Sequence, residues 1–177
     1  MPEDSRLPPL GRSGLVIREA RSTDIDALTR LEAECFASDR LSRRSLASLA
    51  KSPSAWVLVA SNTEGTAGYA VVLMRRGSQR ARLYSIAVSS EATGRGIGSR
   101  LLSAAEDKAR HRGANRLHLE VRADNSKAIG LYERAGYRPV GQKLDYYEDG
   151  MTALLFGRQL VVTAAAGPLA RRLRRAA

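Results

Sequence analysis

Apolar side chains recur along the first third of the chain in patterns typical of one strand and two helices. Residues 15–20 alternate enough to predict a strand. Apolar residues then follow at helical spacing up to about Phe36, and Thr23 at the start of this run predicts an N-cap. A second helix is predicted from Ser42, a good capping residue, to a point just before Pro53. The chain is therefore expected to begin with a strand and two helices.

The next part of the chain has the pattern of three strands joined by short turns. The segments at residues 55–61, 67–74 and 82–88 are strongly apolar, and polar or glycine-containing turns separate them. Connections this short join antiparallel neighbours. The three segments therefore predict an antiparallel meander.

After the meander the pattern changes to helices that alternate with strands. Helices are predicted for residues 97–111 and 125–135. Strands are predicted for residues 116–122, 137–140 and 151–160. Together with the earlier elements, this order predicts an α/β (α+β) fold with a mixed, mostly antiparallel sheet of about seven strands and helices on both faces.

The composition fits one globular domain of ordinary size. The chain has 177 residues, 44% of them hydrophobic, and no segment approaches the roughly 18 to 20 consecutive apolar residues that span a bilayer. All predicted elements lie in residues 15–160, so we expect the domain there, after a flexible leader (1–14) and before a basic tail (161–177). The first residues do not have the pattern of a secretory signal, so we expect a cytoplasmic protein without a membrane partner.

Charge and cysteine content narrow the range of functions. The net charge is +11, and four arginines gather in residues 171–175, so a weak contact with RNA or the ribosome stays open. The single cysteine, Cys35, excludes an intramolecular disulfide, and we expect a small buried thiol there. The two histidines have no metal-ligand spacing with each other or with Cys35, which predicts that no metal is bound.

The most informative segment is a glycine-rich turn between a strand and a helix. Gly94, Gly96 and Gly98 lie between the strand at 82–88 and the helix at 97–111. Helix N-termini bind anions through unpaired N–H groups, and glycine lets a diphosphate approach the backbone. The segment lacks the Lys-Ser/Thr pair of a P-loop and the spacing of a dinucleotide site. On these residues alone, a diphosphate site and a turn without a ligand both stay open.

Two segments in the second half of the chain carry a family resemblance. Residues 86–102 resemble the coenzyme A-binding motif of the GNAT acetyltransferase superfamily, Arg/Gln-x-x-Gly-x-Gly/Ala, with Gly96 and Gly98 at its glycines and Thr93 in place of Arg or Gln. Residues 119–137 are similar to a block of the ribosomal-protein-alanine N-acetyltransferases. The resemblance implies a GNAT-like sheet with a splayed central strand pair. It also implies transfer of acetyl from acetyl-CoA, as co-substrate, to an amine.

The resemblance further implies which residues contact the cofactor. Backbone groups at the end of the strand would hold the pantetheine arm, and amides of the turn would hold the diphosphate. Asn125 is both a matching contact and a plausible helix N-cap. The N–H of Val88 would donate to the oxyanion. The expected set is Ile86, Ala87, Val88, Gly94, Arg95, Gly96, Ile97, Gly98, Ser99 and Asn125.

Two titratable residues are the candidates for proton transfer, and we expect the thioester to lie between them. Glu120 shares one face of its strand with His118 and Arg122 by alternation. The resemblance implies that Glu120 is the general base, directly or through water; a surface glutamate paired with Arg122 is the alternative. Tyr132 would be the general acid, since an ordinary phenol is protonated at neutral pH; the alternative is a core aromatic.

The acceptor is less well defined by the sequence. Tyr146 and Tyr147 match a tyrosine pair near the substrate mouth of related enzymes, and the acidic pair Glu148 and Asp149 either attracts a cationic amine or forms a polar turn. The resemblance makes a protein N-terminal α-amine the first candidate, while a small-molecule amine, a polyamine or a lysine side chain stays open. A non-catalytic acetyl-CoA-binding module and a basic RNA-binding protein are the alternatives from other classes.

Overall fold

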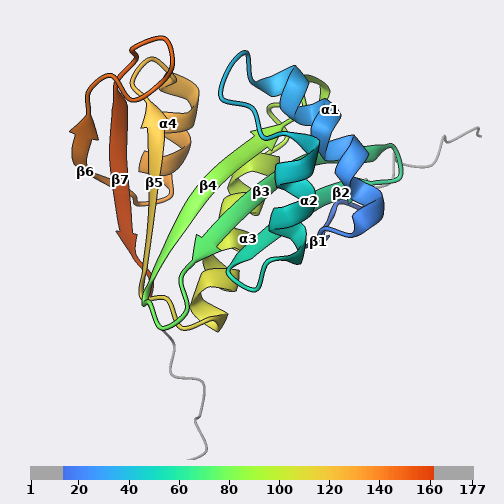
Figure 1. Cartoon of the computed structure of the whole chain (residues 1–177), viewed down its shortest axis with the longest axis horizontal. Helices are drawn as coiled ribbons and strands as arrows, with labels where there is room; N and C mark the ends of the chain where they lie inside the picture. The colour runs from blue at the N-terminus through green and yellow to red at the C-terminus, as the bar shows by residue number, and fades with distance from the viewer. Residues whose placement is uncertain (1–13, 162–177) are drawn as a thin grey trace, which may run out of the picture.

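The computed structural model describes residues 14–161 and is built around a seven-stranded sheet (Figure 1). The order across the sheet is β1-β2-β3-β4-β5-β7-β6, and β4 and β5 are the one parallel pair of neighbours in it. The strands are β1 (Val16–Glu19), β2 (Ala55–Asn62), β3 (Gly65–Met74), β4 (Arg80–Val88), β5 (Arg116–Arg122), β6 (Arg138–Lys143) and β7 (Ala153–Gln159). The predicted mixed, mostly antiparallel sheet is confirmed.

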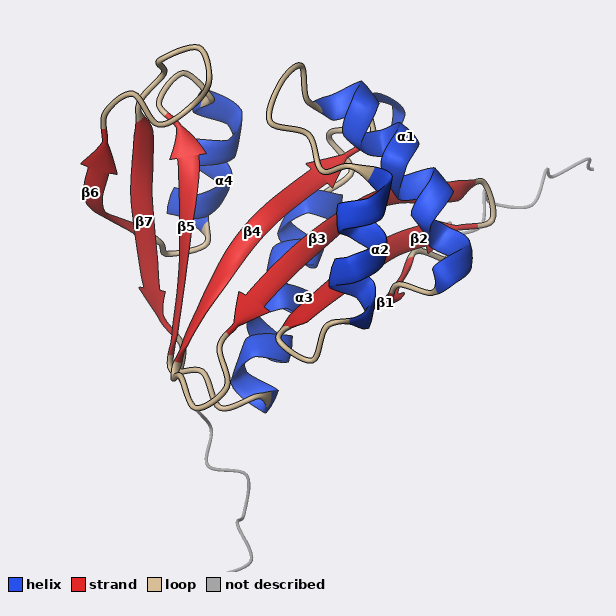
Figure 2. Cartoon of the chain, viewed as in Figure 1, coloured by secondary structure: helices blue, strands red, loops and turns tan. Residues whose placement is uncertain are grey.

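Helices cover both faces of this sheet, as predicted (Figure 2). The helical elements are η1 (Ser22–Asp24), α1 (Ile25–Cys35), α2 (Arg43–Lys51), η2 (Ser90–Ala92), α3 (Ile97–His111) and α4 (Ser126–Arg134), where η denotes a 3-10 turn. α1 and α2 pack on one face of β2, β3 and β4, and α3 packs on the other. α4 lies beside β5 and β7 (Figure 1), and its Tyr132 belongs to the same core as Leu101 of α3.

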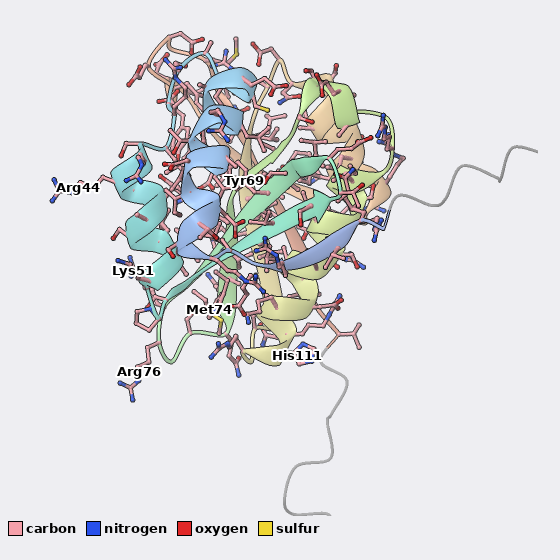
Figure 3. The ribbon with its side chains drawn as sticks, turned by 90° about the vertical axis from the view of Figure 1, so that its right-hand side faces the viewer. Arg44, Lys51, Tyr69, Met74, Arg76 and His111 are labelled. Atoms are coloured by element: carbon pink, nitrogen blue, oxygen red, sulfur yellow. The ribbon has the colours of Figure 1, made fainter. Side chains whose placement is uncertain are left out.

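Alternation along β3 divides its side chains between two cores. Tyr69 and Val71 face α1 and α2, whereas Ala70 and Val72 face α3. Because both faces are covered, β3 is almost continuously apolar in sequence. Tyr69 lies beneath α1 (Figure 3), and its hydroxyl donates a hydrogen bond to the buried carboxylate of Glu32.

Pairing between β4 and β5 ends halfway along the two strands. Four residue pairs are in register, and the last joins Leu83 to Leu119. The next residue of β4, Tyr84, is a bulge in the pairing with β3. A bulge bends and twists its strand, and beyond this point β4 and β5 diverge (Figure 1). The expected splay of the central pair is present.

Two of the three predicted capping residues cap their helices. At the start of α2, Ser42 Oγ accepts the N–H three residues later at 3.1 Å, and Asn125 Oδ1 does the same for α4 at 3.0 Å. The predicted cap at Thr23 is wrong, because Thr23 lies inside η1. The carboxylate of Asp24 accepts the N–H of Arg21 there at 2.6 Å, so a residue placed one position later fixes the turn.

The late strands differ from their predicted bounds. β6 was expected at residues 137–140 but continues to Lys143, past an irregularity between Pro139 and Gly141. All six residues of β6 are exposed, so apolar alternation could not mark its end. β7 falls inside the predicted strand at 151–160.

The predicted leader and tail fall almost wholly outside the described residues. Of these two segments the structure describes Gly14 and Val161. Within residues 14–161, no helix is long and apolar enough to cross a membrane. The same part of the chain holds no cluster of three His, Cys, Asp or Glu side chains that could bind a metal ion.

Gly68 on β3 permits a close contact of this strand with β4 and α3. A Cβ at this position would lie 2.7 Å from the carbonyl oxygen of Ala87 and 3.0 Å from Cδ1 of Leu101. Gly68→Ala is therefore expected to lower the free energy of unfolding by about 1–3 kcal/mol, the usual effect of overpacking a core. Urea denaturation measures this change.

Gly141→Ala on β6 is the matched control for this substitution. A Cβ there would meet Cδ1 of Leu155 at an ordinary 4.0 Å. Its free energy of unfolding should stay within about 0.5 kcal/mol of the parent or rise, because the glycine has no packing reason to be there. Equal stability of Gly68→Ala and the parent would contradict the close contact at β3.

Candidate active site

The glycine-rich turn leads directly into α3 and leaves the first amides of that helix open. Gly94 and Gly96 have φ values of +82° and +72°, a left-handed backbone that favours glycine. Gly96 is also the N-cap of α3, and it has no side chain to accept from the first turn. The N–H groups of Ile97, Gly98 and Ser99 are therefore available to an anion.

Cationic side chains lie around this turn. The side chain of Arg95 is exposed, next to the N-cap. On the other side, Nζ of Lys127 lies 3.5 Å from Oγ1 of Thr93, so the first turn of α4 reaches the loop that precedes α3. Lys127 was not among the predicted contacts. Its place two residues after Asn125, a predicted cofactor contact, was the signal in the sequence for a cation near the glycine-rich turn. Asn125 itself lies at the start of α4 and caps it.

The end of β4, residues 86–88, has β3 as its neighbour on one edge. The N–H of Ser89 donates to the carbonyl of Ala67 on β3 at 3.0 Å. Backbone groups alternate between the two edges of a strand, so the N–H and C=O of Val88 point away from β3. In agreement, the Val88 carbonyl accepts a hydrogen bond from Sγ of Cys35 at 3.4 Å. The backbone of Val88 thus opens on the edge from which β5 has separated.

The last turn of α1 holds the segment that follows β4. Oε1 of Glu34 accepts hydrogen bonds from the N–H and Oγ of Ser90, at 2.7 and 2.6 Å. A buried thiol was expected at Cys35; the residue is half-buried, and this burial raises the pKa of its thiol. The thiol is therefore protonated at neutral pH and donates to the strand end.

Tyr132 is almost fully buried at the start of the gap between the two strands. Its side chain is 4% exposed and packs between the rings of Tyr137 and Phe156, with centroid separations of 5.9 and 6.4 Å. Burial raises the pKa of the phenol well above its ordinary value, and the nearby Tyr147 adds to the effect. Its hydroxyl makes no hydrogen bond to any of residues 14–161. The phenol is protonated at every physiological pH.

Glu120 is held between two cations. Its side chain is 9% exposed, and its two oxygens accept from Nε of Arg82 at 2.7 Å and from Nζ of Lys143 at 3.0 Å. Burial favours the neutral carboxyl, but the hydrogen bond from Lys143 and the charge of Arg82 outweigh it and lower the pKa of Glu120. The alternative pairing with Arg122 is wrong, because that guanidinium binds Asp124 and Asp149 instead.

Glu120 and Tyr132 reach the gap from opposite faces of β5. Leu119 and Val121 share the core of Tyr132, and alternation turns Glu120 to the other face. Tyr147 lies close enough to interact electrostatically with both groups. A molecule between the carboxylate and the phenol would therefore lie in the plane of the sheet, where β4 and β5 are no longer paired.

Tyr146 and Tyr147 lie next to Glu120, in the connection between β6 and β7. Their rings meet edge to face at 5.2 Å, and the Tyr146 hydroxyl accepts from Nη2 of Arg82 at 3.1 Å. Burial raises the pKa of Tyr147 to about 12. Arg82 and Lys143 contact both Glu120 and Tyr146, and the sequence analysis did not identify either of them as a site residue. The one signal for Arg82 was its position on the strand that pairs with β5.

A hollow lies between α3 and α4, on the face of the sheet opposite to Glu120. It has a volume of about 410 Å³. Its walls combine apolar, serine and arginine side chains with one glutamate, and the lining consists of Ser99, Leu102, Ser103, Glu106, Arg110, Leu131, Arg134, Ala135 and Arg158. Ser99 connects this hollow to the first turn of α3, so a ligand held by that turn can extend into cationic surroundings.

Comparison with known proteins identifies the family. The sequence pattern of the acetyltransferase (GNAT) family matches residues 24–137. A Bacillus subtilis protein provisionally named ribosomal protein bS18-alanine N-acetyltransferase is 33% identical over 140 residues, which are 78% of this chain and 91% of the relative. The chain belongs to the acetyltransferase (GNAT) family.

Solved structures agree with this assignment. The ribosomal-protein-S18-alanine N-acetyltransferase of Escherichia coli has a TM-score of 0.74 at 28% identity, over 82% of this chain and 94% of that chain. A Salmonella typhimurium protein provisionally classed as an acetyltransferase, solved with its cofactor acetyl-CoA, has the same fold, with a TM-score of 0.74 at 21% identity, over 88% and 99% of the two chains. The protein is thus an acetyl-CoA-dependent N-acetyltransferase of the GNAT type.

The ion pairs of Glu120 predict a measurable change in its titration. Lys143→Met removes one of the two cations, so the pKa of Glu120 should rise, as measured by carboxyl carbon NMR. A folded pKa below the unfolded one stabilises the fold above the unfolded pKa, and that stability is lost as pH falls through the folded pKa. In Lys143→Met, the loss should still begin near the unfolded pKa, but it should be smaller and should be complete at a higher pH.

Lys127→Met is the control, because it makes the same change of charge at the opposite side of the gap. The pKa of Glu120 should be the same in this variant as in the parent protein. An unchanged pKa in Lys143→Met as well would mean that Lys143 does not contact the carboxylate in solution.

Proposed function

We propose that the protein acetylates the N-terminal α-amine of a protein by direct attack of the amine on acetyl-CoA, with Glu120 as general base and Tyr132 as general acid. The observation that carries this proposal is the state of Tyr132. Its ring is almost completely buried, yet its hydroxyl makes no hydrogen bond to any residue in the range 14–161. No side-chain oxygen that is itself buried lacks a partner among these residues, so the ring is enclosed while the hydroxyl is left free to donate to a ligand atom.

The residues around the gap fit a molecule with a diphosphate and a chain of amides. The amides of Ile97, Gly98 and Ser99 would hold the diphosphate, with Arg95 beside them. The open backbone edge at residues 86–88 would pair with the pantetheine amides like a further strand. Acetyl-CoA supplies the reactive thioester when it is bound.

Proton transfer follows from the surroundings of each group. Tyr132 keeps its proton because burial disfavours the phenolate, so it can donate to a thiolate that leaves at its hydroxyl. The N–H of Val88, which points away from β3, would donate to the oxygen that becomes negative during attack. Glu120 would take the proton of the attacking amine, directly or through water, from the other face of β5.

The low pKa of Glu120 supports an α-amine as acceptor. A carboxylate that two cations stabilise is a weak base, and a weak base removes a proton from an ammonium group poorly. The acceptor is therefore expected to be an amine of which an appreciable fraction is already neutral. With ordinary pKa values, about one in seven α-amines is neutral at pH 7, against about one in 2,500 lysine side chains. The bacterial relative, named for an alanine acceptor in a ribosomal protein, points the same way.

Peptides test the proposed acceptor. A peptide with a free N-terminal alanine and one internal lysine should release coenzyme A thiol in the presence of acetyl-CoA, and mass spectrometry should place the acetyl group on the α-amine. The same peptide with a blocked N-terminus is the control and should stay unmodified. Acetylation of the lysine, or of small amines alone, would overturn the α-amine assignment.

Tyr132→Phe tests the general acid. Loss of a positioned proton donor typically costs 10²–10⁴-fold in rate, so kcat should fall by about 10²-fold or more. The ring remains, and binding of acetyl-CoA, measured as the rise in melting temperature on adding it, should stay close to that of the parent. The Tyr146→Phe variant changes a tyrosine that already has a partner at its hydroxyl, and it should lose less. An unchanged kcat in Tyr132→Phe would remove this residue from the chemistry.

The contact with RNA or the ribosome stays a prediction. It rested on the net charge of +11 and on the arginines of residues 171–175, which lie outside the described residues. In the described part, Arg44, Lys51 and Arg76 project away from the ribbon (Figure 3), as solvated side chains do.

A further inference from the structure

A buried carboxylate on α3 has no part in the proposed proton transfers. Glu106 is 4% exposed, in the core beneath the sheet. Its oxygens accept hydrogen bonds from Nη1 of Arg158 at 2.6 Å, Nη2 of Arg110 at 3.1 Å and the hydroxyl of Tyr137 at 3.1 Å. A buried carboxylate is costly unless it is paired in this way. The three donors therefore hold the carboxylate of Glu106 in place, and the carboxylate in turn holds the side chains of Arg158, Arg110 and Tyr137.

Two of the three donors belong to the other side of the gap. Glu106 and Arg110 are on α3, which packs on β2, β3 and β4. Arg158 is on β7, and Tyr137 lies between α4 and β6. These elements belong with β5 to the part of the fold that has separated from β4, and we call this part and the part formed by β1–β4 with α1–α3 the two arms (Figure 2). The guanidinium of Arg158 also lies 6.0 Å from the centre of the Tyr137 ring. The cluster thus joins the two arms on the face of the sheet opposite to Glu120.

Tyr137 contacts Tyr132 through both its backbone and its ring. The N–H of Tyr137 donates to the carbonyl of Tyr132 at 3.0 Å. The two rings meet edge to face with centroids 5.9 Å apart. Because the Tyr132 hydroxyl makes no hydrogen bond to residues 14–161, packing of its ring against Tyr137 and Phe156 has to set the direction of the phenol.

We propose that Glu106 is a positioning residue, which holds Tyr137 by its hydroxyl and thereby aims the Tyr132 phenol at the leaving sulfur. This inference rests on the proposed role of Tyr132. The hydroxyl at 137 is needed, in this view, because its hydrogen bond to Glu106 fixes the direction of the ring, a restraint that a phenylalanine held by packing alone would lack. Small displacements of a reacting group are costly, since a misplacement of about 1 Å can lower a rate by about 10²-fold.

A double-mutant cycle on kcat tests this inference. Tyr137→Phe removes the hydroxyl and keeps the ring, which is milder than a substitution of Glu106 that would leave two arginines without their partner. It should lower kcat by about 3- to 30-fold, a fraction of what full misplacement costs, with the KM for acetyl-CoA nearly unchanged. In a Tyr132→Phe background, the same substitution should have no further effect, because no phenol is left to aim.

Val59→Ala serves as the stability control. Val59 is fully buried on β2 among the residues that face α1 and α2, so its truncation weakens the fold away from the gap. At a temperature where all variants are folded, Val59→Ala should have the kcat of the parent. If it loses as much as Tyr137→Phe, a general loss of stability explains the effect and the positioning role falls.

The remaining outcomes separate this inference from the proposed function. If Tyr132→Phe retains full kcat, the general acid assignment fails and the positioning role fails with it. If Tyr132→Phe is impaired but Tyr137→Phe costs the same factor in both backgrounds, the general acid stands and the positioning role is overturned. A rise in the KM for acetyl-CoA with unchanged kcat would likewise overturn it, because the cluster would then shape the cofactor site and not the acid.

Discussion

The site depends on the fact that β4 and β5 are hydrogen-bonded to each other over only the first half of their length. Leu83 and Leu119 are the last pair, and the bulge at Tyr84 then turns β4 away from β5. Beyond this point the edges of the two strands that face each other are no longer hydrogen-bonded to each other. Strand edges of this kind bind extended amide chains. A fully paired sheet would place a closed layer between Glu120 and Tyr132. The same separation therefore leaves a strand edge free near both groups.

Electrostatic surroundings push the two candidate groups toward opposite roles. Arg82 and Lys143 keep Glu120 ionised, whereas burial without a hydrogen bond keeps Tyr132 neutral. Pairs of titratable groups whose pKa values are driven apart in this way are typical of acid–base sites. On the opposite face of the sheet, the buried carboxylate of Glu106 joins α3 to Tyr137 and to Arg158 of β7.

Local signals in the sequence were most accurate where one feature decided the structure. The helix at 97–111 and the strand at 116–122 have the predicted bounds, because apolar periodicity in each is strong, and glycines mark the ends of the helix. The cap at Thr23 was wrong because the carboxylate of the next residue, Asp24, accepts the N–H of Arg21 and closes a 3-10 turn that contains Thr23. The predicted strand at 137–140 was too short because β6 is exposed throughout and carries no apolar alternation to mark its end.

The sequence by itself determined the element order, the sheet type, the glycine-rich turn and the positions of Glu120 and Tyr132, since each depends on neighbours a few residues away. The tertiary structure alone decided what those groups meet. Arg82, Lys143 and Lys127 come from other elements, and their contacts depend on strand register and on the angle between the two arms. Charge is felt through space and not along the chain, so the partners that set the pKa of Glu120 could not be found by spacing.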